Sequence, residues 1–196
     1  MKQRLFILLL SSILSISGVF AQNSGYELTV EGVGAIGVSN LSKYNVGVSV
    51  INGFRFGTQL SVGLGVGFRY AETLYYFSED NTLGNYESRD NKFLFPIFAH
   101  VKYNFTKGDI APFIVGDIGY TFDLGKNPNK NLEALFVEPV IGVDFKSPKT
   151  TWFIGLGANV QQHHYTYFHI SDKVKSSDRT IKGVAPSLAL HFGVQF

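Results

Sequence analysis

The chain has no cysteine among its 196 residues. No disulfide can therefore form, and backbone pairing and packing alone must hold the fold. Beyond residue 21 no stretch approaches 18 consecutive apolar residues, which excludes a transmembrane helix. Clustered positive charge is missing as well, because Lys and Arg are dispersed along the chain. We therefore expect no nucleic-acid partner.

Helix-forming patterns are nearly absent, whereas the chain contains 21 glycines and 15% aromatic residues. This composition favours β-strands. The N-terminal segment is different in character: a basic start at Lys2 and Arg4 precedes an apolar run and ends in Val-Phe-Ala before Gln22. These features predict a secretory signal peptide over residues 1–21. Its removal would leave residues 22–196 as one domain and would cancel the net charge of +2.

The last segment, 184–196, alternates apolar and small or polar residues from Pro186 to Phe196. Such alternation predicts a strand with one apolar face. Seven earlier segments show the same two-residue period. The eight expected strands are 26–38, 43–56, 60–70, 93–105, 110–122, 135–145, 151–162 and 184–196.

The connections between these strands alternate in length. Tight turns are expected at 57–59, 106–109 and 146–149, and long loops at 71–92, 123–134 and 163–180, while the first loop, 40–42, is short. An even number of strands joined alternately by short turns and longer loops is typical of outer-membrane β-barrels. We therefore predict an all-β fold, an eight-stranded antiparallel up-and-down transmembrane β-barrel.

The face of the wall on which the charged residues lie distinguishes a membrane barrel from a soluble one. A soluble barrel such as a lipocalin is polar outside, whereas a membrane barrel exposes its apolar face to lipid. Here one face of every strand is rich in Val, Leu, Ile and Phe. The other face carries glycine and the expected interior charges Glu27, Glu31, Arg55, Arg69, His100, Lys102, Asp117, Glu138, Asp144 and His191.

Two further expectations follow from residue positions. Aromatic residues stand at both ends of the outer face, as the two interfaces of a membrane favour. Near the long loops these are Tyr44, Tyr70, Phe93, Tyr120 and Phe122, and near the tight turns Phe56, Tyr103, Phe105, Phe145, Trp152 and Phe196. Prolines within the strands cannot donate to a ladder, so bulges or strand ends are expected at Pro96, Pro112, Pro139 and Pro186.

The signal peptide, the apolar-glycine strands (SVGLGVGFRY, FIGLGANV) and the final strand ending in Phe196 resemble the small outer-membrane β-barrel proteins of the OmpA/OmpX type, particularly those of Bacteroidota. The resemblance covers the whole mature chain. It implies an outer-membrane location in a Gram-negative bacterium and assembly through the C-terminal strand. Members of this family act as anchors, adhesins, envelope-stability proteins and, in a few branches, lipid-modifying enzymes.

The richest chemical cluster is QQHHYTYFHISD, residues 161–172. His169 and Ser171 would share one face of a strand, and the pair resembles the His-x-Ser of lipid A deacylases, in which His is the base for a Ser nucleophile. The acidic partner would have to be Asp172 or Asp178, because no Glu follows Glu138. An incidental surface loop is the favoured interpretation, and we expect no enzyme activity.

Other sites are weaker still. His163 and His164 point to opposite faces of a strand, so only one of them could join His169 around a metal. Paired carboxylates at Glu138 with Asp144, or at Glu27 with Glu31, would share the interior with Arg55, Arg69 and Lys102, and ion pairing is the more economical interpretation. We therefore predict no catalytic, cofactor-binding or metal site.

A narrow interior filled with charged side chains should carry no substantial current. The expected role is structural or in surface interaction, with lipid A modification or a soluble ligand-binding barrel as alternatives. The partners expected are outer-membrane lipid and lipopolysaccharide, the assembly machinery through Phe196, and an extracellular protein or glycan at the long loops. The loop 71–92 carries Tyr75, Tyr76, Phe77 and Tyr86, which suit such contacts or packing within the loop itself.

Overall fold

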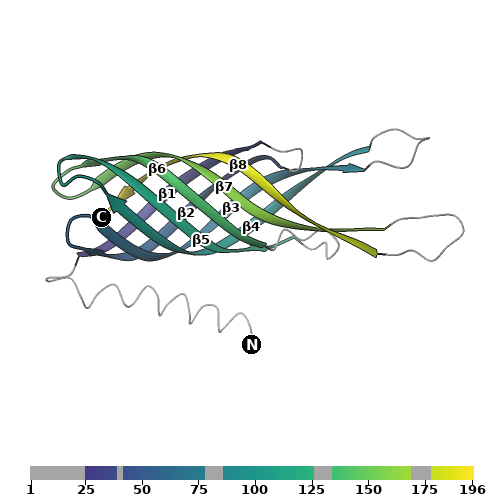
Figure 1. Cartoon of the computed structure of the whole chain (residues 1–196), viewed down its shortest axis with the longest axis horizontal. Coiled ribbons are helices and arrows are strands. Elements are labelled where there is room, and N and C mark those ends of the chain that lie inside the picture. Colours follow the sequence, from purple (N-terminus) through teal and green to yellow (C-terminus); the bar gives the residue numbers. More distant parts are fainter. Residues whose placement is uncertain (1–24, 39–41, 78–85, 126–133, 169–177) are drawn as a thin grey trace, which may run out of the picture.

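The computed structural model describes residues 25–38, 42–77, 86–125, 134–168 and 178–196. These residues form eight antiparallel strands that close into one up-and-down barrel in sequence order (Figure 1). The strands are β1 (Gly25–Gly37), β2 (Ser42–Phe56), β3 (Leu60–Phe77), β4 (Tyr86–Asn104), β5 (Ile110–Asp123), β6 (Ala134–Lys146), β7 (Thr151–Phe168) and β8 (Asp178–Gln195). No helix in the described residues is long and apolar enough to cross a membrane.

The barrel closes between its first and last strands. β1 pairs with β8 from Thr29 opposite Gln195 to Gly37 opposite Ser187. The ladder continues to the terminal residue, because the Phe196 amide donates to the Leu28 carbonyl at 2.9 Å and the Leu28 amide donates to Phe196 at 3.2 Å. Closure leaves no free sheet edge along the shared length of the strands.

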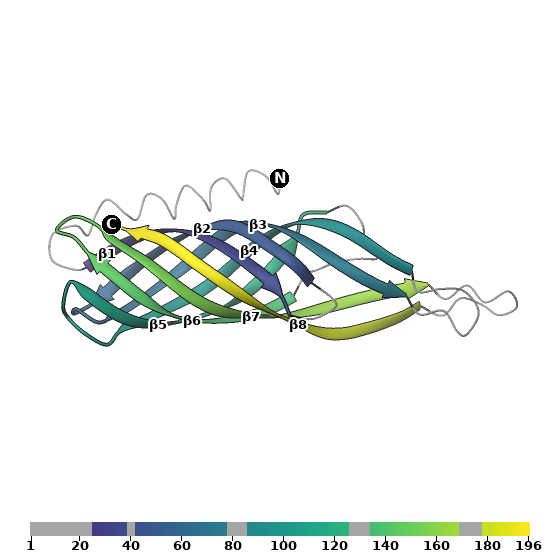
Figure 2. The same cartoon turned by 90° about the horizontal axis from the view of Figure 1, so that it is seen from above.

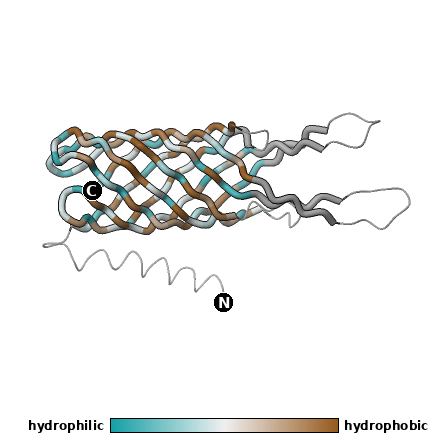
Figure 3. The backbone as a smooth tube through the Cα atoms, in the orientation of Figure 1, coloured by the Kyte–Doolittle hydropathy of each residue, from teal (hydrophilic) through white to brown (hydrophobic). Residues whose placement is uncertain are grey.

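The alternation of the sequence sets the two faces of the wall. Odd and even positions of β1 lie alternately inside and outside, and β5 and β6 repeat the pattern almost without interruption. Apolar and polar residues accordingly alternate along the tube in Figure 3. The predicted strand faces are confirmed on all eight strands. On each strand, the alternate positions that carry the polar residues are buried inside the barrel, and the apolar positions between them face outward.

Four strands are longer than expected. β3 and β4 pair as far as Phe77 opposite Tyr86, and β7 and β8 as far as Phe168 opposite Asp178. These two strand pairs project beyond the other four strands (Figures 1 and 2). The expected loops 71–92 and 163–180 were therefore too long, because backbone pairing continues past the point where apolar alternation stops.

The prediction of bulges or strand ends at the prolines was wrong. Pro96, Pro112, Pro139 and Pro186 all lie within paired strands, and the register on either side of each is unchanged. A register shift occurs elsewhere, between Ser42 and Tyr44 on β2. A proline still has a carbonyl to offer, and those of Pro112 and Pro186 accept from Phe105 and Val38.

Candidate functional site

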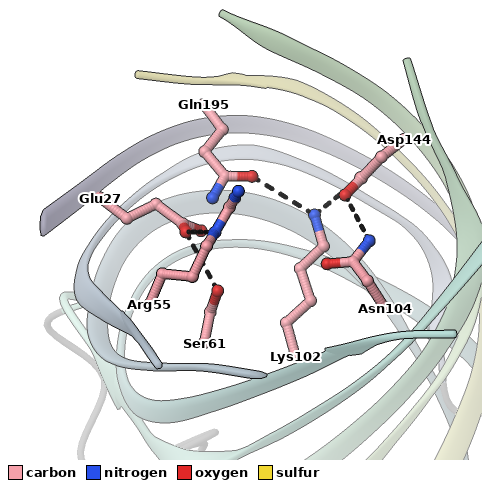
Figure 4. Close-up of polar contacts among 7 residues, drawn as sticks. All are labelled: Glu27, Arg55, Ser61, Lys102, Asn104, Asp144 and Gln195. Atoms are coloured by element: carbon pink, nitrogen blue, oxygen red, sulfur yellow. Dashed lines mark hydrogen bonds and ion pairs between the residues drawn. The ribbon is translucent and has the colours of Figure 1, made fainter. Parts of the chain in front are cut away.

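The interior near the tight turns contains a hydrogen-bonded cluster built from Lys102 on β4 (Figure 4). The Lys102 ammonium lies 2.7 Å from Asp144 Oδ1 and 3.5 Å from Gln195 Oε1. Asn104 donates to the other oxygen of Asp144 at 2.7 Å. Asp144 is fully buried, so its charge is satisfied entirely by this cation and this amide.

A second pair lies beside this cluster on β1 and β2. Arg55 Nε donates to Glu27 Oε2 at 2.8 Å, and the Ser61 hydroxyl donates to the same oxygen at 3.0 Å. The carboxylates Glu27 and Asp144 thus have a separate cation each.

Farther along the interior, Glu138 joins three strands. Arg69 Nη2 donates to Glu138 Oε2 at 2.9 Å. The His191 ring lies between two carboxylates, with its nitrogens 3.3 Å from Glu31 and 3.3 Å from Glu138. The predicted pairing of interior carboxylates with interior cations is confirmed for Glu27, Glu138 and Asp144.

Two further ion pairs start from residues of β4. His100 Nδ1 lies 2.7 Å from Asp117 Oδ1, and this nitrogen donates because a carboxylate can only accept. Lys92 Nζ lies 3.1 Å from Asp123 Oδ2 at the end with the long connections. The sequence interpretation missed the Lys92 pair because both residues had been assigned to loops.

Aromatic side chains fill the space between the charges. Lys102 lies over the rings of Phe113 and Phe153, at 4.4 and 5.1 Å from their centroids. Phe98 meets Phe136 edge to face at 6.0 Å. The inward position of Phe98 follows from strand parity, whereas these ring contacts depend on the register around the barrel.

Little open space remains inside. One small cavity lies among Thr29, Glu31, His100, Lys102, Phe113 and His191. Its free volume is about 10 Å³, which suffices for about one water molecule. The interior thus resembles a packed core more than a channel, although conductance itself stays a prediction.

The outer wall exposes large apolar side chains on all eight strands. Leu64, Ile141, Leu156, Leu188 and Phe192 are each more than half exposed. Predicted aromatic positions are exposed near both ends of the wall, including Tyr44, Phe93 and Phe122 near the long connections and Phe56, Trp152 and Phe196 near the tight turns. Near the long connections Tyr44, Tyr70 and Phe93 form a continuous group with centroid distances of 6.3 and 5.3 Å.

Most of the residues that resemble a lipid A deacylase site lie outside the described part of the chain. His169, Ser171 and Asp172 lie outside the described residues, and Asp178 is described as a backbone position opposite Phe168. His163 and His164 pair through the backbone with Gly183 and Lys182. In the described part of the chain, no three His, Asp or Glu side chains gather as a metal site.

Comparisons with known proteins agree on the fold. OprG of Pseudomonas aeruginosa, an outer-membrane protein, superposes with a TM-score of 0.55 at 10% identity, over 88% of this chain and 97% of that one. Neisserial surface protein A (NspA) gives 0.50 at 15% identity, over 89% and 98%. The outer-membrane enzyme PagL gives 0.46 at 14% identity, over 84% and 97%. No family model and no curated protein matches the chain.

The fold is therefore that of the small outer-membrane β-barrels. Such low identity carries no information on activity, because one fold supports many functions.

Proposed function

We propose that this protein is an integral outer-membrane β-barrel with a structural or surface-interaction role. The observation that carries the proposal is the inverted distribution of polarity. Charged groups are buried in pairs inside the barrel, while large apolar side chains such as Leu156 and Phe192 are exposed around it. In water this outer wall would expose a large apolar surface, which soluble proteins avoid. In a bilayer the same surface contacts the apolar acyl chains of the lipids.

A soluble ligand-binding barrel is disfavoured by the interior. A cavity that holds about one water is too small for an organic ligand. The same packing disfavours a pore, and we expect a flat current trace from the protein in a planar bilayer. No described group of side chains favours catalysis at the interior.

The proposal also specifies the surroundings of the barrel. The outer wall contacts membrane lipid and, in the outer leaflet, lipopolysaccharide, and the long connections meet extracellular protein or glycan. The strand ending at Phe196 is the segment that the assembly machinery engages. Cleavage after residue 21, the location in a Gram-negative outer membrane and the kinship with OmpA/OmpX-type proteins of Bacteroidota belong to this proposal.

The test is the migration of the protein, recovered from an outer-membrane fraction, on detergent gels with and without boiling. A closed barrel resists cold detergent because it has no edge strand from which to unfold. We expect the protein in the outer-membrane fraction, with a mobility shift on boiling. Recovery as a soluble periplasmic protein without a shift would reject the proposal.

A mass measurement on lipid A tests the enzymatic alternative separately. Cells that express the wild type and cells that express His169→Ala should contain lipid A of the same mass. A lipid A species that lacks an acyl chain only with the wild type would establish the deacylase instead.

A further inference from the structure

Asn52 interrupts the apolar outer wall of β2. Among the described outward positions between the two aromatic zones, Asn52 alone carries a polar group. Its register partners are Leu28 on β1 and Leu64 on β3, both apolar. The amide is therefore surrounded by hydrocarbon on either side.

The depth of Asn52 places it inside the apolar band. It stands two outward positions from Phe56, where β2 reaches the tight turn. On a strand that rises about 3.3 Å per residue and tilts by about 40°, it lies roughly 10 Å above Phe56. Asparagine is too short to reach either interface from there, unlike a long lysine or arginine.

The amide is unsatisfied within one copy of the barrel. In the described part of the chain, the Asn52 side chain makes no hydrogen bond. The rings immediately below it, Tyr26 and Phe54, pack edge to face with each other at 6.0 Å. Because acyl chains offer no hydrogen bonds, an amide at this position is costly unless another protein group meets it.

We propose that Asn52 lies at the centre of a homodimer interface and pairs with Asn52 of a second copy. Two copies inserted with the same topology are related by a two-fold axis along the membrane normal, so a residue can meet its own counterpart at equal depth. An amide has both a donor and an acceptor, and two amides can satisfy each other. This inference rests on the proposed membrane location.

The wall beside Asn52 is compact on the side of the long connections. There its outward neighbours on β2 are Val50 and then Val48, both β-branched. Close contact of two such surfaces would bury apolar side chains around a central hydrogen-bonded pair.

Cysteine cross-linking tests the interface directly, because the chain has no cysteine of its own. An Asn52→Cys variant in membranes should form a covalent dimer on mild oxidation. The matched control is Ile141→Cys on β6, which is four strands from β2 around the closed barrel and two outward positions from the tight-turn residue Phe145. We expect this control to give only collisional background.

A second measurement tests the role of the amide. Energy transfer between copies labelled at Ser147→Cys, in vesicles of increasing lipid content, reports self-association. Asn52→Leu should weaken association about threefold to thirtyfold, the range for buried amide hydrogen bonds between membrane segments. Ile141→Leu should leave it unchanged.

The outcomes are distinguishable from failure of the proposed function. Each sample is also run with and without boiling, and absence of a heat shift would reject the membrane barrel. A heat shift with Asn52→Cys cross-linking no better than Ile141→Cys, or with Asn52→Leu associating as the wild type does, would overturn the dimer alone. Cross-linking to a different protein in native membranes would also overturn it.

Discussion

Glu138 shows how strongly single residues depend on partners from distant parts of the chain. Its carboxylate is fully buried on β6 and accepts from Arg69 on β3, with His191 of β8 alongside. A buried charge without its partner is much more costly than either the intact pair or an apolar replacement of both.

Removal of one partner should therefore destabilise the barrel more than removal of both. We predict that Glu138→Leu lowers the free energy of unfolding by about 3–5 kcal/mol, because Arg69 is left buried without a counter-ion. The double variant Arg69→Met with Glu138→Leu should recover most of the loss. Urea titration in vesicles, followed by the gel shift, measures both. Equal losses in the single and double variants would contradict this interpretation of the pair.

A glycine that faces the interior can leave space for a neighbouring aromatic ring. A glycine that faces outward can lie in open space, where no ring depends on it. At Gly65 an added Cβ would overlap the ring of Phe98, which itself packs with Phe136. At Gly34 an added Cβ meets nothing within 4 Å. The two positions therefore form a matched pair of glycines on the two faces of one wall.

We predict that Gly65→Ala costs about 1–3 kcal/mol of unfolding free energy, because Phe98 must leave its position. Gly34→Ala should not destabilise, and removal of a flexible glycine from a strand can add about 0.5 kcal/mol. The same urea titration compares them. A larger loss for Gly34→Ala than for Gly65→Ala would show that the assignment of inside and outside is reversed.

At the scale of elements, the tight turn between β2 and β3 has a specific backbone requirement. Gly57 has φ of +65°, a conformation that costs a side-chain-bearing residue about 1–2 kcal/mol. We predict that Gly57→Ala destabilises the barrel by about that amount. Gly108→Ala, in the turn before β5, has only one contact, at 3.9 Å, and no such φ, and should be neutral. Equal effects at the two turns, measured by urea titration, would argue against strain at Gly57.

The elements also show what the sequence could and could not reveal. Apolar alternation was sufficient to identify eight strands, their order and the face that each buries. It did not reveal the outer parts of β3, β4, β7 and β8, because strand segments that project past the other four strands have no need of a continuous apolar face. The prediction of bulges at the prolines was wrong for a different reason. The strands tolerate the missing N–H donor of a proline without a change of register.

Partners inside the barrel could be predicted only by charge type. That a cation would neutralise Glu138 or Asp144 followed from burial, whereas the choice of Arg69 for one and Lys102 for the other depends on strand tilt and stagger. In the most promising chemical cluster, residues 161–172, the candidates His169, Ser171 and Asp172 lie outside the described residues. Its role stays a prediction.

For the molecule as a whole, the surroundings of the outer wall distinguish a membrane barrel from a soluble one. The single tryptophan, Trp152, is 60% exposed on this wall near the tight turns. Indole rings favour the interface of a bilayer, where an apolar ring and a polar N–H are both accommodated. Trp152 is therefore a native probe of whether the wall faces lipid or water.

The most direct measurement is the quenching of Trp152 fluorescence in vesicles that contain brominated lipids. If the outer wall faces lipid, bromine near the headgroup end of the acyl chains should quench strongly, and bromine at the chain ends should quench less. Aqueous iodide should have a smaller effect than on the unfolded chain. Emission that iodide quenches fully and brominated lipids leave unchanged would place the wall in water and contradict the membrane barrel.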